Sequence, residues 1–194
     1  FGLANAQDVK FGVKGSLALS NLTGDTDGAD VKSKMGFNAG GFAEFKLADK
    51  FSIQPEILYS LQGTKFENIV MPFDGDFVNS NLTFNLSYIN IPVMFKYYVA
   101  DKFSIEAGPQ IGFLTSAKGL VKIDGYPGEI KESVKEMFKS TDFTLNLGCG
   151  YNFTENISAG VRYGIGLSNI AKQVSGEDFK WHNNVFALSV GYKF

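Results

Sequence analysis

Charged side chains alternate with apolar ones in several segments of the sequence, and they are the best candidates for chemistry. They are Lys10, Lys14, Glu44, Lys46, Glu56, Lys96, Glu106, Arg162 and Lys193. If these groups share one enclosed surface, they form either a self-satisfied network of ion pairs or a narrow path for ions or protons. An acid pair such as Glu56 and Glu106 would also suit acid–base chemistry. Each glutamate of the set has a basic neighbour available, so we predict ion pairing.

Other reactive residue types are scarce. His182 is the only histidine and Cys149 the only cysteine, which argues against a zinc cluster, an intrachain disulfide and a Ser-His-Asp site. Asp25 to Asp30 place oxygens at alternate positions as in a calcium loop, but the glutamate at EF-hand spacing is missing. We interpret this segment as a solvated loop tip, with a calcium site as the alternative. The sequence therefore predicts no enzyme, no metal and no cofactor.

Strict alternation of apolar and small or polar residues organises the chain, as from Ile157 to Ser168 and from Phe186 to Phe194. This period of two predicts β-strands, each about as long as the ~9–11 residues that cross a bilayer. Eight such segments can be drawn, at 9–20, 35–47, 51–62, 84–99, 103–116, 141–153, 157–168 and 183–194. Three tight turns alternate with long connections at 21–34, 63–83, 117–140 and 169–182. This pattern predicts an all-β fold, an eight-stranded antiparallel transmembrane barrel with short periplasmic turns and long extracellular loops.

The chain has 19 Phe and 8 Tyr, and their positions along the predicted strands test this prediction. Those on the apolar phase fall into two groups along the predicted strands. Near the short turns lie Phe11, Phe45, Phe51, Tyr97, Phe103, Tyr151, Phe153, Tyr192 and Phe194, and near the long loops lie Phe37, Tyr59, Phe113, Phe143, Tyr163 and Phe186. Two aromatic belts are typical of a barrel in a bilayer. We predict a bacterial outer-membrane location, contact with outer-membrane lipid, and both termini on the periplasmic side.

Composition and the N-terminus fit this location. The formal charge is −2 and no basic stripe is present, so we expect no nucleic-acid partner. Ala4 and Ala6 before Gln7 form the small-x-small pattern of a signal-peptidase site. We interpret residues 1–6 as a signal-peptide remnant and 7–194 as one outer-membrane β-barrel domain.

Three stretches carry a family resemblance: YINIPVMFKY at 88–97, GPQIGFL at 108–114 and RYGIGLSNI at 162–170. They resemble the PorT-like outer-membrane β-barrel family of Bacteroidota, and the likeness runs from Val9 to Phe194. The resemblance implies the fold and the location but no particular activity, because the family is mostly uncharacterised. Tyr192 and Phe194 also resemble the C-terminal signal that the barrel-assembly machinery reads, which implies that machinery as a partner during biogenesis.

The long connections are where we place function, because binding residues concentrate in loops. Loop 63–83 carries apolar residues, among them Ile69, Met71, Phe73 and Phe77, and helical spacing predicts a short amphipathic helix at 129–139 with Met137 and Phe138 on its apolar face. We predict that these residues contact a protein partner. The favoured function is a non-enzymatic accessory or interaction subunit of a larger outer-membrane assembly. The alternatives are a surface receptor or adhesin-like barrel, or a soluble lipid-binding barrel, which would turn its apolar residues inward. A passive channel is disfavoured, because an eight-stranded lumen is filled by side chains.

Overall fold

A computed structural model describes residues 9–25, 30–73, 76–123, 125, 127–172 and 180–194. The strands are β1 (Val9–Gly24), β2 (Asp30–Ala48), β3 (Phe51–Phe73), β4 (Asp76–Ala100), β5 (Phe103–Ile123), β6 (Ile130–Ser133), β7 (Thr141–Asn152), β8 (Ile157–Gly166) and β9 (Trp181–Lys193). The one helical turn in the described part of the chain is the 3-10 turn η1 (Lys135–Met137). Among the described residues, no helix has the length and apolar character needed to cross a membrane.

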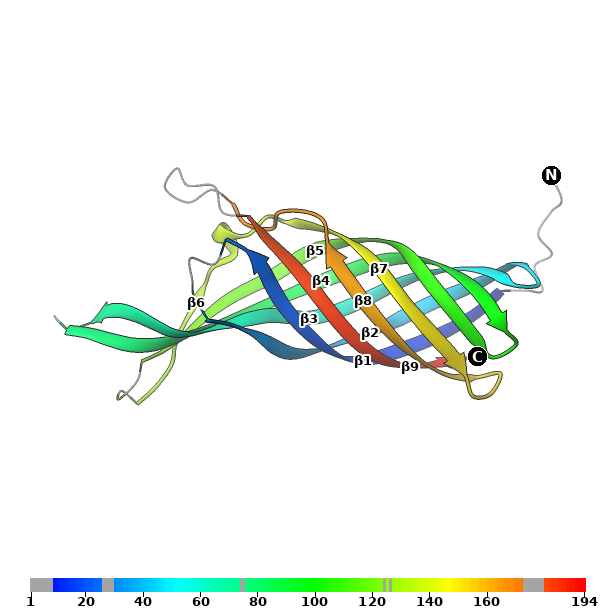
Figure 1. The fold of residues 1–194 in the computed structure, drawn as a ribbon, viewed down its shortest axis with the longest axis horizontal. Helices are drawn as coiled ribbons and strands as arrows, with labels where there is room; N and C mark the ends of the chain where they lie inside the picture. The colour runs from blue at the N-terminus through cyan, green and yellow to red at the C-terminus, as the bar shows by residue number, and fades with distance from the viewer. Residues whose placement is uncertain (1–8, 26–29, 74–75, 124, 126, 173–179) are drawn as a thin grey trace.

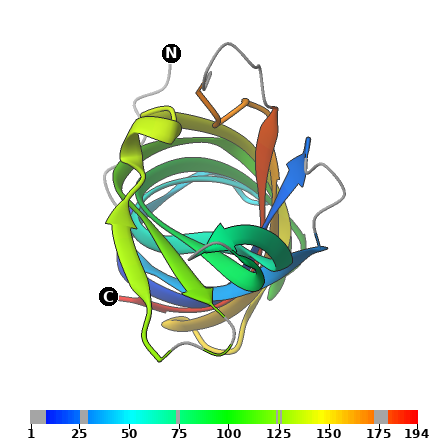
Figure 2. The ribbon, with the colours of Figure 1, turned by 90° about the vertical axis from the view of Figure 1, so that its left-hand side faces the viewer.

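Eight of the strands close into a ring in which every neighbour is antiparallel. The order is β1-β2-β3-β4-β5-β7-β8-β9, and β9 pairs with β1 to complete the cylinder, as Figures 1 and 2 show. The short strand β6 lies outside the ring and pairs with the far part of β5. The predicted eight-stranded antiparallel barrel is confirmed.

The two ends of the barrel differ. At one end, called here the short-turn end, β2 connects to β3, β4 to β5 and β7 to β8, and β1 begins and β9 ends there. At the other, the long-strand end, β3 and β4 continue well beyond the ring as a twisted hairpin, with β5 and β6 beside it (Figure 1). Seen end-on, these extensions lie in front of the ring (Figure 2).

Two expectations about the long connections were wrong. Segment 63–83 is not a loop, because β3 runs to Phe73 and β4 starts at Asp76. Segment 129–139 is not an amphipathic helix but β6 followed by η1. The physical reason is that β5 continues to Ile123 and offers an open edge, and Ile130 to Ser133 satisfy their backbone groups on it, from Val121 to Lys118. Apolar residues at helical spacing, such as Met137 and Phe138, do not outweigh such a ladder.

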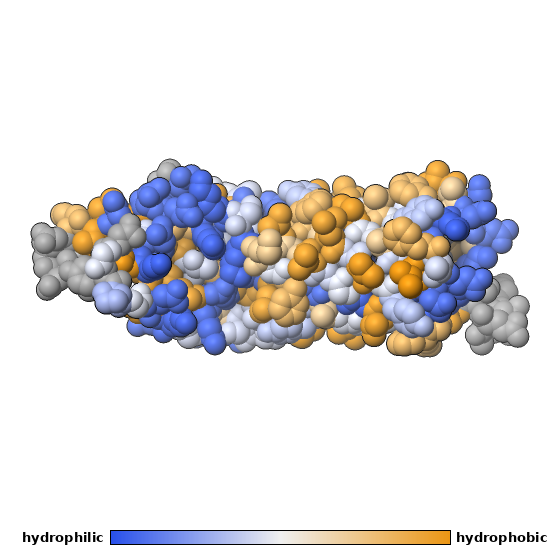
Figure 3. Space-filling view, turned by 90° about the horizontal axis from the view of Figure 1, so that it is seen from below, coloured by the Kyte–Doolittle hydropathy of each residue, from blue (hydrophilic) through white to orange (hydrophobic). Residues whose placement is uncertain are grey.

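Apolar side chains cover the outer wall of the ring. Both aromatic groups are exposed there, among them Phe11, Phe51 and Tyr192 near the short-turn end and Phe37 and Tyr163 near the long-strand end. Figure 3 shows apolar side chains over the cylinder, with a hydrophilic rim at the short-turn end and a hydrophilic zone over the extensions. This arrangement is the reverse of a soluble lipid-binding barrel, whose apolar residues would face inward.

Candidate functional site

The middle of the lumen holds a network of four charged side chains, the middle cluster, formed by Lys14, Glu56, Glu106 and Arg162. Alternation along β1, β3, β5 and β8 turns all four inward. Lys14 Nζ lies 2.7 Å from Glu56 Oε1, and Arg162 Nη2 lies 2.9 Å from the same oxygen. Arg162 also donates from Nη1 to Glu56 Oε2 at 3.0 Å, and from Nε and Nη2 to Glu106 Oε1 at 3.0 and 2.8 Å. The two positive and two negative charges cancel.

A second network, the lower cluster, lies nearer the short-turn end. Glu44 Oε2 is 2.8 Å from Lys193 Nζ and 3.3 Å from Lys96 Nζ, and Tyr98 donates its hydroxyl hydrogen to Glu44 Oε1. Gln54 joins the two clusters, because it accepts from Lys96 Nζ at 3.1 Å and donates to Glu56 Oε1 at 2.7 Å. The result is one continuous chain of hydrogen bonds and ion pairs across the lower half of the lumen.

Seven of the nine charged residues predicted for the lumen belong to these clusters. The other two, Lys10 and Lys46, are exposed at the short-turn mouth, where they line a cavity of about 820 Å³ together with Glu44 and Lys193. Lys46 Nζ is 3.9 Å from the exposed carboxylate of Asp49. Their assignment to the polar core is corrected: near the strand ends the lumen widens into solvent, so a side chain on the inward phase stays hydrated.

The acid pair Glu56 and Glu106 does not have the environment of a proton-transfer site. Both carboxylates bind Arg162, and Glu56 also binds Lys14 and Gln54. A general base needs an accessible lone pair facing a substrate, whereas the side chain of Glu56 is fully buried. The arrangement is that of a structural ion-pair core.

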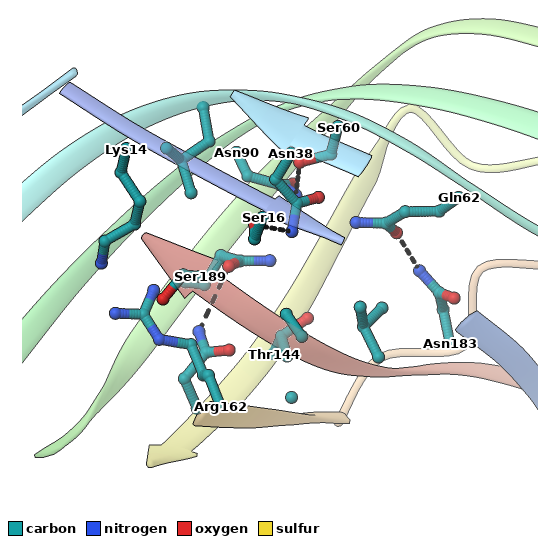
Figure 4. Close-up of a pocket in the computed structure, with 16 residues that line it drawn as sticks. Lys14, Ser16, Asn38, Ser60, Gln62, Asn90, Thr144, Arg162, Asn183 and Ser189 are labelled. Atoms are coloured by element: carbon teal, nitrogen blue, oxygen red, sulfur yellow. Dashed lines mark hydrogen bonds between the residues drawn. The ribbon is translucent and has the colours of Figure 1, made fainter. Parts of the chain in front are cut away.

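On the long-strand side of the middle cluster lies a layer of neutral polar side chains, drawn in Figure 4. Asn183 donates to Gln62 Oε1 at 2.6 Å, Asn90 to Ser60 Oγ at 2.8 Å and Asn38 to Ser16 Oγ at 3.1 Å. The cavity among these residues has a volume of about 40 Å³. That space suits a few water molecules, each of which needs roughly 10–15 Å³.

The long-strand mouth is closed by an apolar cluster, the cap, that the sequence analysis did not predict. Its members are Leu22, Phe66, Phe84, Leu86, Tyr88, Leu114, Ala117, Phe138 and Ile170, with Trp181 packed against them. Phe84 is its centre, with ring centroids 5.8 Å from Phe66, 5.5 Å from Phe138 and 6.1 Å from Trp181. A signal for it was present, because the inward phase of β3 and β4 changes from polar to apolar at Phe66, Phe84 and Leu86.

Three of the predicted partner-contact residues, Ile69, Met137 and Phe138, pack in or against the cap. Phe138 is 1% exposed and fills the cap, so its assignment to a contact surface is corrected. Ile69 and Met137 are partly buried against the cap. Phe77 is 81% exposed near the tip of the β3–β4 hairpin. Met71 and Phe73 lie in β3 opposite Val78 and Asp76, and the placement of their side chains is outside the described residues.

Cys149 lies on β7 between Ile105 and Val161, on the outer wall. Most of the acidic run 25–30 and the signal remnant 1–6 fall outside the described residues. Asp25 itself accepts from the backbone N–H of Lys180 at 3.0 Å. In the part of the chain that the structure describes, no group of three or more His, Cys, Asp or Glu residues could hold a metal ion.

Comparison with known proteins gives one family and several structural relatives. The family described as "outer membrane protein beta-barrel domain" matches residues 5–172, and no curated protein matches the sequence. Ail, the attachment invasion locus protein of Yersinia pestis, superposes with a TM-score of 0.55 at 13% identity, covering 96% of this chain and 99% of Ail. The structure of Ail with the heparin analogue sucrose octasulfate gives 0.53 at 14% identity over 96% and 99%. Neisserial surface protein A gives 0.53 at 15% identity over 95% and 97%. At these identities the likeness shows the fold alone.

Proposed function

We propose that this chain, which belongs to the outer membrane protein β-barrel domain family, is a closed, non-enzymatic barrel that displays a binding arm at the cell surface. The binding arm is the β3–β4 hairpin beyond the ring, from Phe66 to Phe84, with β6 and η1 beside it. The observation that carries the proposal is the contrast along this arm. Its base is fixed by the buried rings of Phe66, Phe84 and Phe138, whereas Phe77 near its tip is 81% exposed.

The barrel itself is suited to support and not to transport. The lower half of the lumen is crossed by ion pairs, the middle layer leaves about 40 Å³ free, and the cap closes the far mouth. An ion would have to break paired charges in a low-dielectric setting to pass. We expect no steady conductance from the purified protein in planar bilayers, and a stable open pore would contradict the proposal.

The arm is suited to binding because its base is anchored. Aromatic packing at its base restricts the hairpin, and a restrained binding element loses less entropy when its partner docks. Large apolar side chains left in water commonly mark contact surfaces. Besides Phe77, Val70 on β3 is 60% exposed and Ile130 on β6 is 49% exposed.

The structural relatives support a surface role by analogy only. Ail is named for attachment and invasion, and it has been crystallised with a heparin analogue. The accessory-subunit function predicted from the sequence remains the second candidate, because the same exposed Phe77 would equally suit a partner within an outer-membrane assembly. The two candidates differ in whether the partner belongs to the same cell.

The outer-membrane location follows from the family, and the orientation belongs to the proposal. We place the long-strand end outside the cell and the short-turn end, with both termini, in the periplasm, since this is the usual arrangement of such barrels. Recognition of Tyr192 and Phe194 by the barrel-assembly machinery, and the narrower likeness to PorT-like barrels of Bacteroidota, remain hypotheses that rest on the sequence.

The test replaces the exposed apolar residues of the arm. We expect Phe77→Ser with Val70→Ser to abolish co-purification of partners in mild detergent and attachment of expressing cells to their target surface. Barrel folding, followed by heat-modifiable gel migration, should be unchanged. Asn79→Ser, an exposed polar change on the same hairpin, is the matched control. Retention of every wild-type partner and of attachment by the folded double variant would show that the arm does not bind.

A further inference from the structure

Three lysines gather on the outer wall near the base of the arm, and we call Lys32, Lys34 and Lys65 the lysine triad. Lys32 and Lys65 are direct partners across the β2–β3 ladder. Lys65 lies between Thr64 and Phe66, which are both buried inside, so alternation turns Lys65 outward. Lys34 lies in the β2 irregularity between Ser33 and Phe37. Partial burial and the neighbouring Lys65 ammonium lower the pKa of Lys34.

Negative partners neutralise the triad only in part, because two carboxylates, those of Asp30 and its cross-strand partner Glu67, stand beside three lysines. Asp30 Oδ1 lies 3.4 Å from Lys32 Nζ, and both side chains are about half exposed, so this pair contributes little. Among the described residues, no carboxylate lies within 4 Å of the ammonium of Lys34 or Lys65. Like charges directly opposite on neighbouring strands destabilise a sheet. An anionic ligand between the lysines would remove this repulsion.

The height of the triad on the wall identifies the kind of ligand. The exposed apolar wall of β2 ends at Phe37 and Met35, and Met35 is 69% exposed. On β3, Lys65 is four residues beyond Leu61, which is about 10 Å along the barrel axis at a rise of ~3.3 Å per residue and a tilt of ~40°. The headgroup layer begins where the apolar wall ends. Lysine stems are long enough to reach back into that layer.

We propose that the lysine triad binds the phosphate groups of a phosphorylated glycolipid in the outer leaflet, with the acyl chains of that lipid against Met35 and Phe37. Compact ammonium groups on flexible stems suit phosphate oxygens arriving from several directions. A lipid fits better than a soluble polyanion because the charges stand directly above an exposed apolar surface. The inference rests on the proposed orientation but not on partner binding by the arm.

The direct test measures binding of fluorescent diphosphorylated lipid A to the purified protein in neutral detergent. Removing one lysine near an anionic surface weakens binding about five-fold. We therefore expect the triple variant K32Q/K34Q/K65Q to lose affinity by a factor on the order of 100. The control K46Q/K50Q/K102Q removes three positive charges from the opposite rim and should bind like the wild type. Equal affinity of the triad variant and the wild type would overturn the proposal.

Two further binding measurements identify the source of the phosphate. Dephosphorylated lipid A should bind the wild type as weakly as diphosphorylated lipid A binds the triad variant. Inorganic phosphate and sucrose octasulfate should compete poorly. If sucrose octasulfate binds as tightly as lipid A and depends on the triad, the lipid assignment is wrong and the ligand is a soluble polyanion.

Stability gives a second readout that a merely structural role would not produce. Without lipid A, K65Q should unfold at a temperature equal to or above that of the wild type, because a like-charge pair is removed. With lipid A, the wild type should gain more thermal stability than K65Q. A K65Q protein that is less stable without lipid and gains as much with it would overturn the proposal.

Orientation is tested separately by cysteine labelling. Lys65→Cys in a Cys149→Ala background should react with an impermeant maleimide on intact cells. Labelling only after lysis would overturn the orientation, and with it this inference, whereas lipid A binding by the purified protein would be unaffected. Failure of the Phe77 variants to lose partners would leave the inference standing.

Discussion

Arg162 is the residue whose removal tests the ion-pair core most directly. Its guanidinium donates to Glu56 and Glu106 at 2.8–3.0 Å, and its side chain is 12% exposed. Replacing it with Met preserves most of the volume but leaves the middle cluster with one positive and two negative charges. Lys14 still neutralises Glu56 at 2.7 Å, so the uncompensated group is Glu106.

The expected cost of Arg162→Met is about 3–5 kcal/mol, the usual penalty for one unpaired buried charge. The double variant Arg162→Met with Glu106→Gln restores charge balance, because only the Lys14–Glu56 pair remains. We therefore expect the second substitution to recover most of the lost stability, which is a coupling between the two sites. Equilibrium unfolding by urea in lipid vesicles, for the wild type and the single and double variants, measures both quantities.

Two results would refute this reasoning. If Arg162→Met lowers the free energy of unfolding by less than about 1 kcal/mol, the lumen is wet enough to hydrate Glu106 and the core is not closed. If the double variant is as unstable as the single one, the cost came from lost packing of the arginine stem and not from charge.

Two further predictions concern the wall and the cap. Val161→Arg turns a charge into the bilayer and should cost about 2–4 kcal/mol in vesicle unfolding, whereas Ser158→Arg, on the opposite phase of β8, should cost much less; equal costs would refute the register. Phe138→Ser removes a buried ring from the cap and should lower the stability of the arm by about 3–5 kcal/mol, seen as faster proteolysis of the arm with heat-modifiable migration retained. Phe77→Ser is the exposed aromatic control for that experiment and should leave proteolysis unchanged.

The barrel was predictable because the bilayer imposes a period of two. Val161 and Leu188 are apolar residues flanked by small or charged ones. They can face only lipid, and this sets strand, register and closure together. The charged residues of the inward phase followed from the same alternation. The pairing of Arg162 with Glu56 did not, because β3 and β8 are brought together only by closure, whereas Glu106 lies in the same row as Arg162, across Gly148 of β7.

The arm was not predictable because it lies beyond the bilayer, which therefore no longer determines which face of a strand is apolar. Past the membrane, Phe66 and Phe84 continue the alternation and mark the change from polar to apolar residues on that phase, but nothing local shows whether this apolar face lies inside or outside. They are buried by side chains of distant segments, among them Phe138 and Trp181, which lie 54 or more residues further along the chain. The sequence pattern therefore places Phe138 on a surface, whereas in the structure it belongs to the cap.

The junction between barrel and arm depends on Gly63. Its backbone has a φ of 144°, a conformation essentially restricted to glycine, and a β-carbon there would overlap the carbonyl group of Phe84. Ser20 fixes the same point, because its hydroxyl accepts from the Gly63 N–H and donates to the Gly63 carbonyl, each at 2.8 Å. The β2 irregularity between Ser33 and Phe37 lies directly opposite.

Gly63→Ala therefore strains the sheet where the lumen changes from polar to apolar. We expect a cost of at least about 1–3 kcal/mol from the backbone conformation alone, confined to the arm because the ion pairs below it are untouched. Limited proteolysis should then cut the arm faster, while heat-modifiable migration of the ring is retained. Ser60→Ala, a buried change lower on the same strand, should leave the rate of cleavage in the arm unchanged. If Gly63→Ala instead lowers the stability of the whole barrel, ring and arm fold as one unit, and the arm cannot be treated as a separate binding element.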